Sequence, residues 1–107
     1  MIKNLINVEP KEIIPGYLGK FFHGDGMTIA FWSVKKNSKI PPHSHHHEQC
    51  LFVQKGTFEL KIDNKKKTLK SNDIIVIPSN KKHSGKAITE CQLIDFFSPR
   101  RKEYNND

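Results

Sequence analysis

The chain has 107 residues, of which 18 are Lys or Arg and 11 are Asp or Glu, so its formal net charge is +7 and its isoelectric point is about 9.5. This length allows one compact domain with a buried core, but it is too short for a catalytic domain joined to a separate DNA-reading module. The basic residues are scattered through turn-like segments and form no aromatic and basic strip, so we expect no nucleic-acid partner.

The N-terminal segment and the two cysteines bear on location. Residues 1–16 reach Glu9, Pro10 and Lys11 before a long apolar stretch develops, so we expect neither a signal peptide nor a membrane span, and a cytoplasmic location. Cys50 and Cys91 lie in separate apolar runs and form no CxxC pair. We therefore expect two buried thiols and no disulfide.

Short runs of β-forming residues alternate with segments rich in Gly, Asn, Asp, Ser and Pro, which favour turns. No segment shows a sustained helical period. The predicted strands span residues 27–34, 50–53, 57–62, 67–70, 73–78 and 91–97. Strands of this length and spacing are typical of an antiparallel sandwich or barrel. We predict one all-β domain over residues 1–107, with an N-terminal arm at 1–10 and a tail at 102–107 that could be disordered.

Two of these strand segments predict more than a strand. Phe58, Leu60 and Ile62 alternate with polar residues before a turn at Asn64, which predicts a hairpin with one buried face. The run Asp-Ile-Ile-Val-Ile at 73–77 is apolar at consecutive positions, which predicts a central strand covered on both faces.

Four of the six histidines lie within the ten residues PPHSHHHEQC at 41–50. His43 and His45 are two positions apart, so in an extended strand they project from one face with Cα atoms roughly 6.6 Å apart. Two imidazoles at this spacing can converge on one metal ion. Gln49 has the same parity, but in a straight strand it would lie roughly 20 Å from His43, too far to share a cation.

Two arrangements of this segment remain open. Strand parity alone nominates His43, His45 and His47 as ligands. A bend after His45 would instead return Gln49 to the site and leave His46 and His47 in an exposed loop. We favour the second arrangement, in which neither His46 nor His47 belongs to the site.

A further donor, His83, begins the segment after the 73–78 strand. Two neighbouring donors on one strand and a distant histidine on another are a common way for a β scaffold to fix metal coordination. We expect His23 in a polar turn. Glu48 is either a surface charge or an acceptor for the second ring N–H of a ligand histidine.

The same residues resemble the two motifs of small single-domain cupins. The first motif, HxHxxxE followed by six residues and Gly, is matched by His43, His45, Gln49 and Gly56. The second, a Gly-Asp turn, a short strand, a Pro-x-Gly turn and a histidine, is matched by Asn72, Asp73, Pro78, Asn80 and His83. Gln49 replaces Glu, and Asn72 and Asn80 replace Gly, a mild change because Asn tolerates the left-handed backbone conformation. The resemblance implies a cupin double-stranded β-helix, a jelly-roll barrel.

Over residues 43–104 the chain resembles the KdgF-type pectin-degradation cupins, which linearise unsaturated uronates. The strings that carry this resemblance are HSHHHEQ, IPSNKKH and LIDFFSPRRKEY. The resemblance implies one divalent metal ion with the ligands His43, His45, Gln49 and His83. It also implies that Asp95, Phe97 and Arg101 handle a small anionic, sugar-derived substrate.

The residue types in the last strand fit that chemistry. Asp95 and Phe97 share one strand face, opposite Ile94 and Phe96, so a carboxyl and an aromatic wall could line one cavity. Burial would raise the pKa of Asp95 toward neutrality, which suits proton transfer, and Arg101 offers a planar grip for a carboxylate. The alternatives are an edge-strand Asp95 paired with a lysine, and a Phe97 that is plain core. Either Phe31 or Trp32, on opposite faces, could line the cavity.

The sequence therefore predicts a metal-dependent cupin, expected to be a homodimer, that promotes ring opening and tautomerisation of a 4,5-unsaturated uronate. A non-catalytic metal- or sugar-binding cupin and a metal-dependent oxygenase are the alternatives. The neutral Gln49 leaves the full charge on the metal, which disfavours the oxygenase because an oxidised metal is less well stabilised. Zinc, nickel, manganese, iron and cobalt all accept imidazole and amide ligands.

Overall fold

The computed structural model describes residues 1–104, which form ten β-strands and two short 3-10 helices. In chain order these are η1 (Leu5–Asn7), β1 (Lys11–Ile14), β2 (Tyr17–His23), β3 (Thr28–Val34), β4 (Lys39–His43), β5 (Glu48–Lys55), β6 (Phe58–Ile62), β7 (Lys65–Leu69), β8 (Ile74–Ile77), β9 (His83–Ala87), β10 (Cys91–Ser98) and η2 (Lys102–Tyr104). The prediction of an all-β chain is confirmed.

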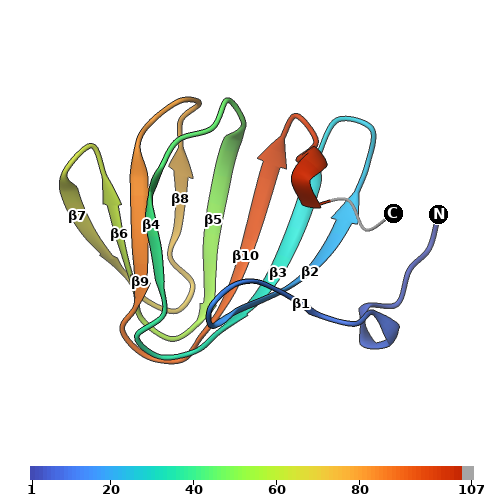
Figure 1. The fold of residues 1–107 in the computed structure, drawn as a ribbon, viewed down its shortest axis with the longest axis horizontal. Helices are drawn as coiled ribbons and strands as arrows, with labels where there is room; N and C mark the ends of the chain where they lie inside the picture. The colour runs from blue at the N-terminus through green and yellow to red at the C-terminus, as the bar shows by residue number, and fades with distance from the viewer. Residues whose placement is uncertain (105–107) are drawn as a thin grey trace.

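The strands form two antiparallel sheets that face each other across the core (Figure 1). The larger sheet has six strands in the order β1-β2-β3-β10-β5-β8, and the smaller has four in the order β4-β9-β6-β7. The crossovers between sheets agree with the predicted jelly roll. Among the described residues no strand pairing joins the two sheets, so the predicted barrel is an open one.

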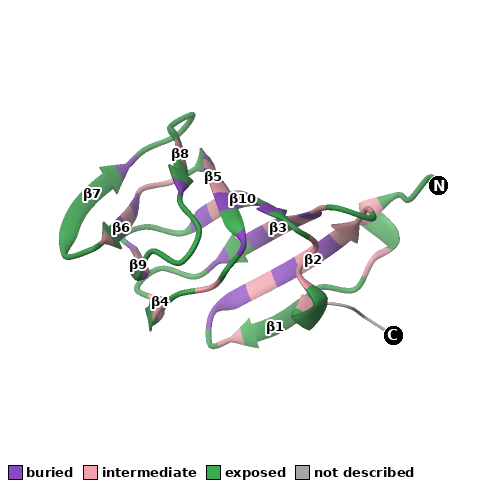
Figure 2. Cartoon of the chain, turned by 90° about the horizontal axis from the view of Figure 1, so that it is seen from above, coloured by how far each residue is buried: buried purple, intermediate pink, exposed green. Residues whose placement is uncertain are grey.

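Alternation along the strands builds the core, as the bands of burial in Figure 2 show for β2 and β10. In β3, Thr28, Ala30, Trp32 and Val34 face inward and are buried. The predicted hairpin is confirmed: β6 pairs with β7, and Phe58 and Leu60 are buried. Polar residues that point inward on such a scaffold must therefore lie within an apolar interior.

Four strands escaped prediction because their sequences do not look like strands. β4 is Lys-Ile-Pro-Pro-His, and its prolines are accommodated because β4 is an edge strand of the smaller sheet. β9 is polar and contains Gly85, and β2 is interrupted by Gly19 and Lys20. The edge strand β1 is short and mostly exposed.

The prediction that the 73–77 run is a central strand is wrong. Within the described chain β8 is one of the two edge strands of the larger sheet and pairs with β5 alone. Ile77 is buried, but Ile74 is 64% exposed and Val76 52% exposed. The run is apolar on both faces although its outer face is uncovered in the single chain, and a sequence cannot distinguish this case from burial on both sides.

Both ends of the described chain lie outside the two sheets. The N-terminal arm, residues 1–10, contains η1 and extends beyond β2 at the right of Figure 1. The predicted tail begins in η2, which packs against the core through Tyr104, and residues 105–107 lie outside the described residues. Among residues 1–104, no helix has the length and apolar character needed to cross a membrane.

Candidate metal centre and ligand cavity

Three histidines from two adjacent strands and one bend converge at one end of the space between the sheets. His43 ends β4 and is the cross-strand partner of His83, which begins β9. His45 follows in the bend, and its ring centroid lies 5.5 Å from that of His43 and 5.0 Å from that of His83. One ligand nitrogen from each of the three lies within 4.8 Å of the others, close enough to share one metal ion.

The bend after His45 is held by the turn that precedes His83. The backbone N–H of Asn80 donates to the carbonyl of His45 at 2.8 Å, and the Ser79 hydroxyl donates to the carbonyl of His46. The two segments that supply the histidines are therefore tied together. The bend also brings Gln49 back to the site. The arrangement with a bend after His45 was the one favoured from the sequence.

Each histidine is oriented by a backbone carbonyl. The Nδ1 atoms of His43, His45 and His83 lie 3.0, 3.0 and 2.8 Å from the carbonyls of Pro41, His47 and Lys81. A carbonyl only accepts, so each Nδ1 carries the ring proton and each Nε2 presents a lone pair. The protein thus fixes the tautomer that Nε2 ligation of a metal requires.

The electrostatics of His45 and His83 also suit a cation. Burial, followed by the nearby positive charges of Arg101 and the other histidines, lowers the pKa of His45 to about 4. Burial lowers the pKa of His83 as well. Both rings are neutral at pH 7. The Nε2 atom of His83 is buried and has no hydrogen-bond partner, which is costly unless a ligand occupies the site.

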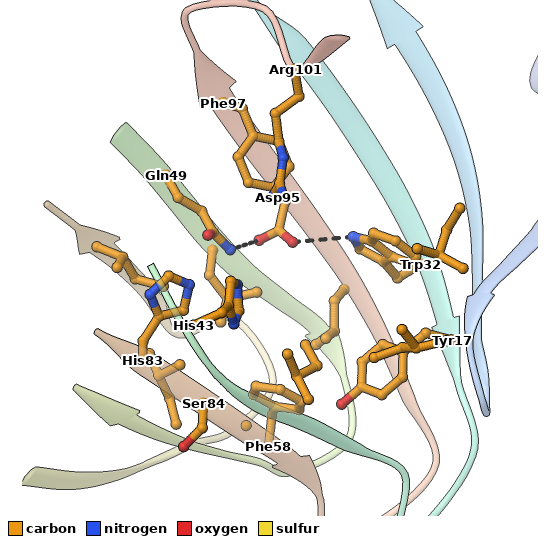
Figure 3. A pocket seen from close by; sticks show the side chains of 18 of the residues that line it. Tyr17, Trp32, His43, Gln49, Phe58, His83, Ser84, Asp95, Phe97 and Arg101 are labelled. Atoms are coloured by element: carbon orange, nitrogen blue, oxygen red, sulfur yellow. Dashed lines mark hydrogen bonds between the residues drawn. The ribbon is translucent and has the colours of Figure 1, made fainter. Parts of the chain in front are cut away.

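Gln49 supplies a fourth donor whose orientation is fixed by Asp95. Its amide Nε2 donates to Asp95 Oδ1 at 2.8 Å, drawn in Figure 3, so its oxygen points the other way. That oxygen lies 3.2 Å from His45 Nε2. Because the ring proton of His45 is on Nδ1, two lone pairs face each other there with no proton between them. A cation bound by both atoms would resolve this contact, so the donor set fits a divalent metal.

Asp95 lies in the middle of the larger sheet, on β10 between β3 and β5. The alternative of an edge-strand carboxylate paired with a lysine is therefore wrong. The side chain is 7% exposed, its Oδ2 accepts the indole N–H of Trp32 at 3.1 Å, and burial raises its pKa to about 6 against the opposing effect of its hydrogen bonds. The sequence argument for a raised pKa is confirmed.

Arg101 lies over the aromatic ring of Phe97, where the chain leaves β10. Its guanidinium carbon is 4.7 Å from the centroid of Phe97 and 4.5 Å from that of Tyr104. Its NH2 group pairs with Glu103 at 3.0 Å, and its Nε atom is buried without a partner. Two rings and one carboxylate therefore hold the guanidinium in place beside the cavity, with further N–H groups left for a ligand.

A cavity of about 350 Å³ begins at the histidines and extends between the sheets. Its polar wall comprises His43, Gln49, His83, Ser84, Asp95 and Arg101, most of which converge in Figure 3. Its floor is apolar and includes Tyr17, Trp32, Leu51, Phe58, Leu60, Ile77 and Leu93. Of the two alternatives on β3, Trp32 lines the cavity and Phe31 does not.

Comparison with known proteins shows the family to which the chain belongs. The model of the cupin domain matches residues 30–97. The chain belongs to the cupin family. The pectin degradation protein KdgF of Dickeya dadantii is 37% identical over 94 residues, covering 76% of this chain and 86% of that protein.

Two solved structures have the same fold over nearly the whole chain. KdgF from Halomonas sp. superposes with a TM-score of 0.88 at 26% identity and covers 94% of both chains. An RmlC-like cupin from Shewanella frigidimarina superposes with a TM-score of 0.91 at 24% identity and covers 96% of this chain and 94% of that one. The resemblance to KdgF-type cupins is confirmed.

The departures from the cupin motifs are accommodated by the backbone. Asn72 and Asn80 adopt φ values of +75° and +64°, so asparagine takes the left-handed conformation that glycine adopts in the motif. Gly56 retains the motif residue at φ +99°, where a Cβ atom would lie 2.3 Å from the carbonyl oxygen of Glu90. The turns that frame the site are therefore the expected ones.

The expectation that His47 lies in an exposed loop beside His46 is wrong. His47 is only 4% exposed and packs against Phe97, while its carbonyl orients His45. His46 and Glu48 are exposed, as expected of a loop and a surface charge. Of the two cysteines, Cys91 is buried as expected, whereas Cys50 is only half-buried.

Sequence reasoning missed the roles of three residues: Trp32, Glu103 and Tyr104. It treats Trp32 only as a cavity wall, although a buried indole normally needs an acceptor and Asp95 is a buried acceptor. Glu103 and Tyr104 belong to a segment that gives no structural signal of its own. His23 bonds Thr28 and the carbonyl of Tyr104, so it anchors η2 from the end of β2.

Proposed function

We propose that this cupin binds one divalent metal ion and promotes ring opening and tautomerisation of a 4,5-unsaturated uronate to its linear keto form. The observation that carries the proposal is the contact between Gln49 and Asp95. It joins the proposed metal ligands to a buried carboxyl whose pKa is about 6, within one cavity. The similarity to the two KdgF proteins supports the substrate class.

The reaction is an isomerisation, so its proton must be moved rather than consumed. A base removes the proton of the C1 hydroxyl, the bond from C1 to the ring oxygen breaks, and the enol left at C5 becomes a ketone as C4 takes up a proton. Asp95 is the proposed carrier in both steps. A carboxyl with a pKa of about 6 is close enough to neutrality both to accept and to release a proton.

His43, His45, His83 and Gln49 are the proposed metal ligands. When bound, a divalent cation there would supply positive charge for the carboxylate and ring oxygens of the substrate. All four donors are uncharged, so the protein itself does not neutralise that charge. The carbonyls that fix the three Nδ1 protons keep the donor atoms in place before a metal binds.

Arg101 and Phe97 are the proposed substrate-positioning residues. The side chain of Arg101 is only 11% exposed and is restrained by Phe97, Tyr104 and Glu103, so little side-chain entropy remains to be lost when it binds a carboxylate. The ring of Phe97 limits how the sugar can lie against Asp95. A volume of about 350 Å³ suits a monosaccharide.

The test follows the absorbance of the 4,5-unsaturated bond of a monomeric uronate in the presence of metal-loaded protein. The protein should accelerate its loss beyond the spontaneous rate, and His43→Ala should abolish the acceleration along with stoichiometric metal binding. His46→Ala is the matched control, because it removes an exposed histidine from the same loop and should retain both properties. No acceleration by the metal-loaded protein, or acceleration that survives in His43→Ala, would refute the proposal.

Two further measurements, of uronate binding and of oxygen uptake, distinguish the other two predicted functions. Tight binding of the uronate without turnover would indicate a non-catalytic binding protein. Oxygen uptake by the iron-loaded protein with a panel of small substrates would indicate an oxygenase.

A further inference from the structure

We propose that His23 and Thr28 are positioning residues for the carboxylate-binding residue Arg101, because they hold the C-terminal turn η2 at both of its ends. We call these two residues the tail clasp. The inference rests on the proposed function in one respect, which is that Arg101 binds a substrate carboxylate. The hydrogen bonds of the clasp can be tested without the reaction.

The turn η2 is too short to hold its own shape. It has three residues and is closed by the backbone N–H of Tyr104, which donates to the carbonyl of Arg101 at 3.2 Å. Fixing the backbone of one 3-10 turn costs more conformational entropy than a single hydrogen bond returns. The position of η2 therefore depends on groups outside the turn.

The tail clasp bonds both ends of η2. At its start, the backbone N–H of Arg101 donates to Thr28 Oγ1 at 2.9 Å. At its end, His23 Nε2 lies 3.0 Å from the carbonyl of Tyr104. His23 and Thr28 are cross-strand partners on β2 and β3, and His23 Nδ1 lies 2.8 Å from Thr28 Oγ1. Two paired strands of the larger sheet thus fix the turn that lies beside them in Figure 1.

The two ends of this chain of hydrogen bonds fix where its protons lie. The carbonyl of Tyr104 only accepts, so His23 Nε2 carries the ring proton and Nδ1 of the neutral ring presents a lone pair. The backbone N–H of Arg101 only donates, so the Thr28 hydroxyl accepts it and donates its own proton to Nδ1. Thr28 is 0% exposed, so solvent does not replace a partner that is lost.

The tail clasp lies in the same row of the larger sheet as two residues of the candidate site. The strand registers run from His23 through Thr28 and Phe97 to Gln49. Thr28 is directly opposite Phe97, and the guanidinium carbon of Arg101 lies 4.7 Å from the centroid of the Phe97 ring. The sheet that carries the aromatic support of Arg101 therefore also fixes its backbone.

The side-chain contacts of Arg101 do not replace this anchor. Two of its neighbours, Glu103 and Tyr104, belong to η2 and move with it. The ring of Tyr104 packs on Phe21 at a centroid distance of 4.6 Å, which restrains the end of the turn, whereas Thr28 holds the main chain at Arg101. A displacement of about 1 Å in a residue that positions a substrate is costly. Loss of the clasp should therefore weaken substrate binding.

Matched threonine variants test this expectation. Thr28→Val keeps the shape of the side chain and removes the hydroxyl, whereas Thr28→Ser retains it. Thr28→Val should raise the KM for a monomeric 4,5-unsaturated uronate at least about 10-fold and leave kcat within about 3-fold, because a carboxylate contact acts on ground state and transition state alike. Thr28→Ser should keep KM within about 2-fold.

Thr89→Val is the matched control. The hydroxyl of Thr89 also accepts a backbone N–H, from Thr57, and donates to a carbonyl, that of Glu90, but it lies outside the cavity wall. Its loss should change neither KM nor kcat. An equal rise of KM in Thr89→Val and Thr28→Val would show a general effect of losing a hydroxyl, and would overturn the inference.

Double variants show whether the clasp acts through Arg101. In an Arg101→Ala background there is no guanidinium left to misplace, so adding Thr28→Val should raise KM by less than about 2-fold more. His23→Leu breaks the same chain of hydrogen bonds, so it should raise KM as Thr28→Val does, and the two together should have no larger effect than one. Increases in KM that multiply in the Arg101→Ala background would overturn the inference.

Tryptic cleavage after Arg101 and Lys102 measures the clasp without the reaction. Mass spectrometry should show the tail released at least about 10-fold faster from Thr28→Val than from the wild type or Thr89→Val. Unchanged cleavage in Thr28→Val would overturn the inference whether or not the protein opens uronates. Faster cleavage with an unchanged KM would also overturn it, because the clasp would then hold the tail without positioning Arg101.

Failure of the proposed reaction gives a different result from failure of the clasp. If the wild type binds the uronate without turnover, the reaction is refuted and the dissociation constant takes the place of KM in each comparison. A rise of at least about 10-fold in that constant for Thr28→Val would still support the clasp. A wild type that does not bind the uronate would overturn the role of Arg101 and the inference with it.

Discussion

The two faces of the larger sheet are made by the same strands but have opposite characters. The inner face carries Gln49 and Asp95, which are hydrogen-bonded to each other within a largely apolar cavity. The outer face, one residue away along each strand, carries Cys50 and Phe96. The two polar groups inside are hydrogen-bonded to each other, whereas outside Cys50 is half-buried and Phe96 is 47% exposed. The comparison shows that one residue's displacement along a strand separates a buried polar pair from a partly exposed apolar surface.

The sharpest test of this comparison is a pair of substitutions at adjacent positions of β10. Asp95→Asn should lower kcat for uronate ring opening by about 10²- to 10⁴-fold, because it removes the proposed proton carrier. Phe96→Asn should leave kcat within about 2-fold of the wild type, because this side chain is 47% exposed on the face of β10 that points away from the cavity. Steady-state kinetics on both variants gives the result. Similar losses in the two variants would show that β10 acts only as scaffold.

A reciprocal exchange tests whether Asp95 is the reason that position 49 holds Gln rather than Glu. Gln49→Glu places two carboxylates about 2.8 Å apart and should destabilise the metal-free protein by about 3 kcal/mol, with part of the cost relieved by protonation. Adding Asp95→Asn restores complementarity, because the introduced amide can donate to the introduced carboxylate while its oxygen accepts from Trp32. The melting temperature and the metal affinity should both return toward the wild-type values in the double variant.

Ring-opening activity should not recover with them, because the double variant lacks the carboxyl at position 95. This separates the positioning role of the contact from proton transfer. If the double variant is as unstable as Gln49→Glu alone, the two side chains are not coupled as the structure indicates.

The pH dependence of stability should show the buried carboxyl directly. The folded-state pKa of Asp95 is about 6 and its ordinary value 3.8, so the folded state holds this proton more tightly than the unfolded state. The tighter binding of this proton contributes about 3 kcal/mol to the free energy of unfolding below about pH 4. This contribution is lost as the pH rises to about 6. The lowered pKa of His45 acts oppositely in this window, since stability is lost as the pH falls from 6.5 to about 4.

The difference in unfolding free energy between the metal-free wild type and Asp95→Asn isolates the carboxyl from the histidines. We expect this difference to shift against the wild type as the pH rises from about 4 to about 6. A difference that is independent of pH would mean that Asp95 titrates normally and that its burial does not set its pKa.

The smallest expected effect concerns Trp32 and Phe31, neighbours on opposite faces of β3. Trp32→Phe removes the hydrogen bond to Asp95 and should cost about 1 to 3 kcal/mol. That bond lowers the pKa of Asp95, so the acidic limb of the rate profile should move to higher pH. Phe31→Tyr should change stability by less than about 0.5 kcal/mol, since its hydroxyl can reach solvent. An unshifted profile in Trp32→Phe would assign the indole a packing role alone.

The sequence determined the all-β class, six of the ten strands, the hairpin of β6 and β7, the two motif turns and the candidate ligands, because each depends on local spacing or on backbone conformation at one residue. It also indicated that Asp95 and Phe97 share a face. These features follow from a two-residue period that a β-strand imposes regardless of its neighbours.

Tertiary structure alone decided which face met the core, which strand lay at an edge, and where the bend brought Gln49. The apolar run of β8 looks the same in sequence whether a second layer covers it or not. His47 became buried in the folded chain. Asp95 acquired two hydrogen-bond partners that lie far away in the sequence: Gln49, at a separation of 46 positions, and Trp32, at a separation of 63 positions. Such contacts depend on the order of strands in the sheet, which no local pattern records.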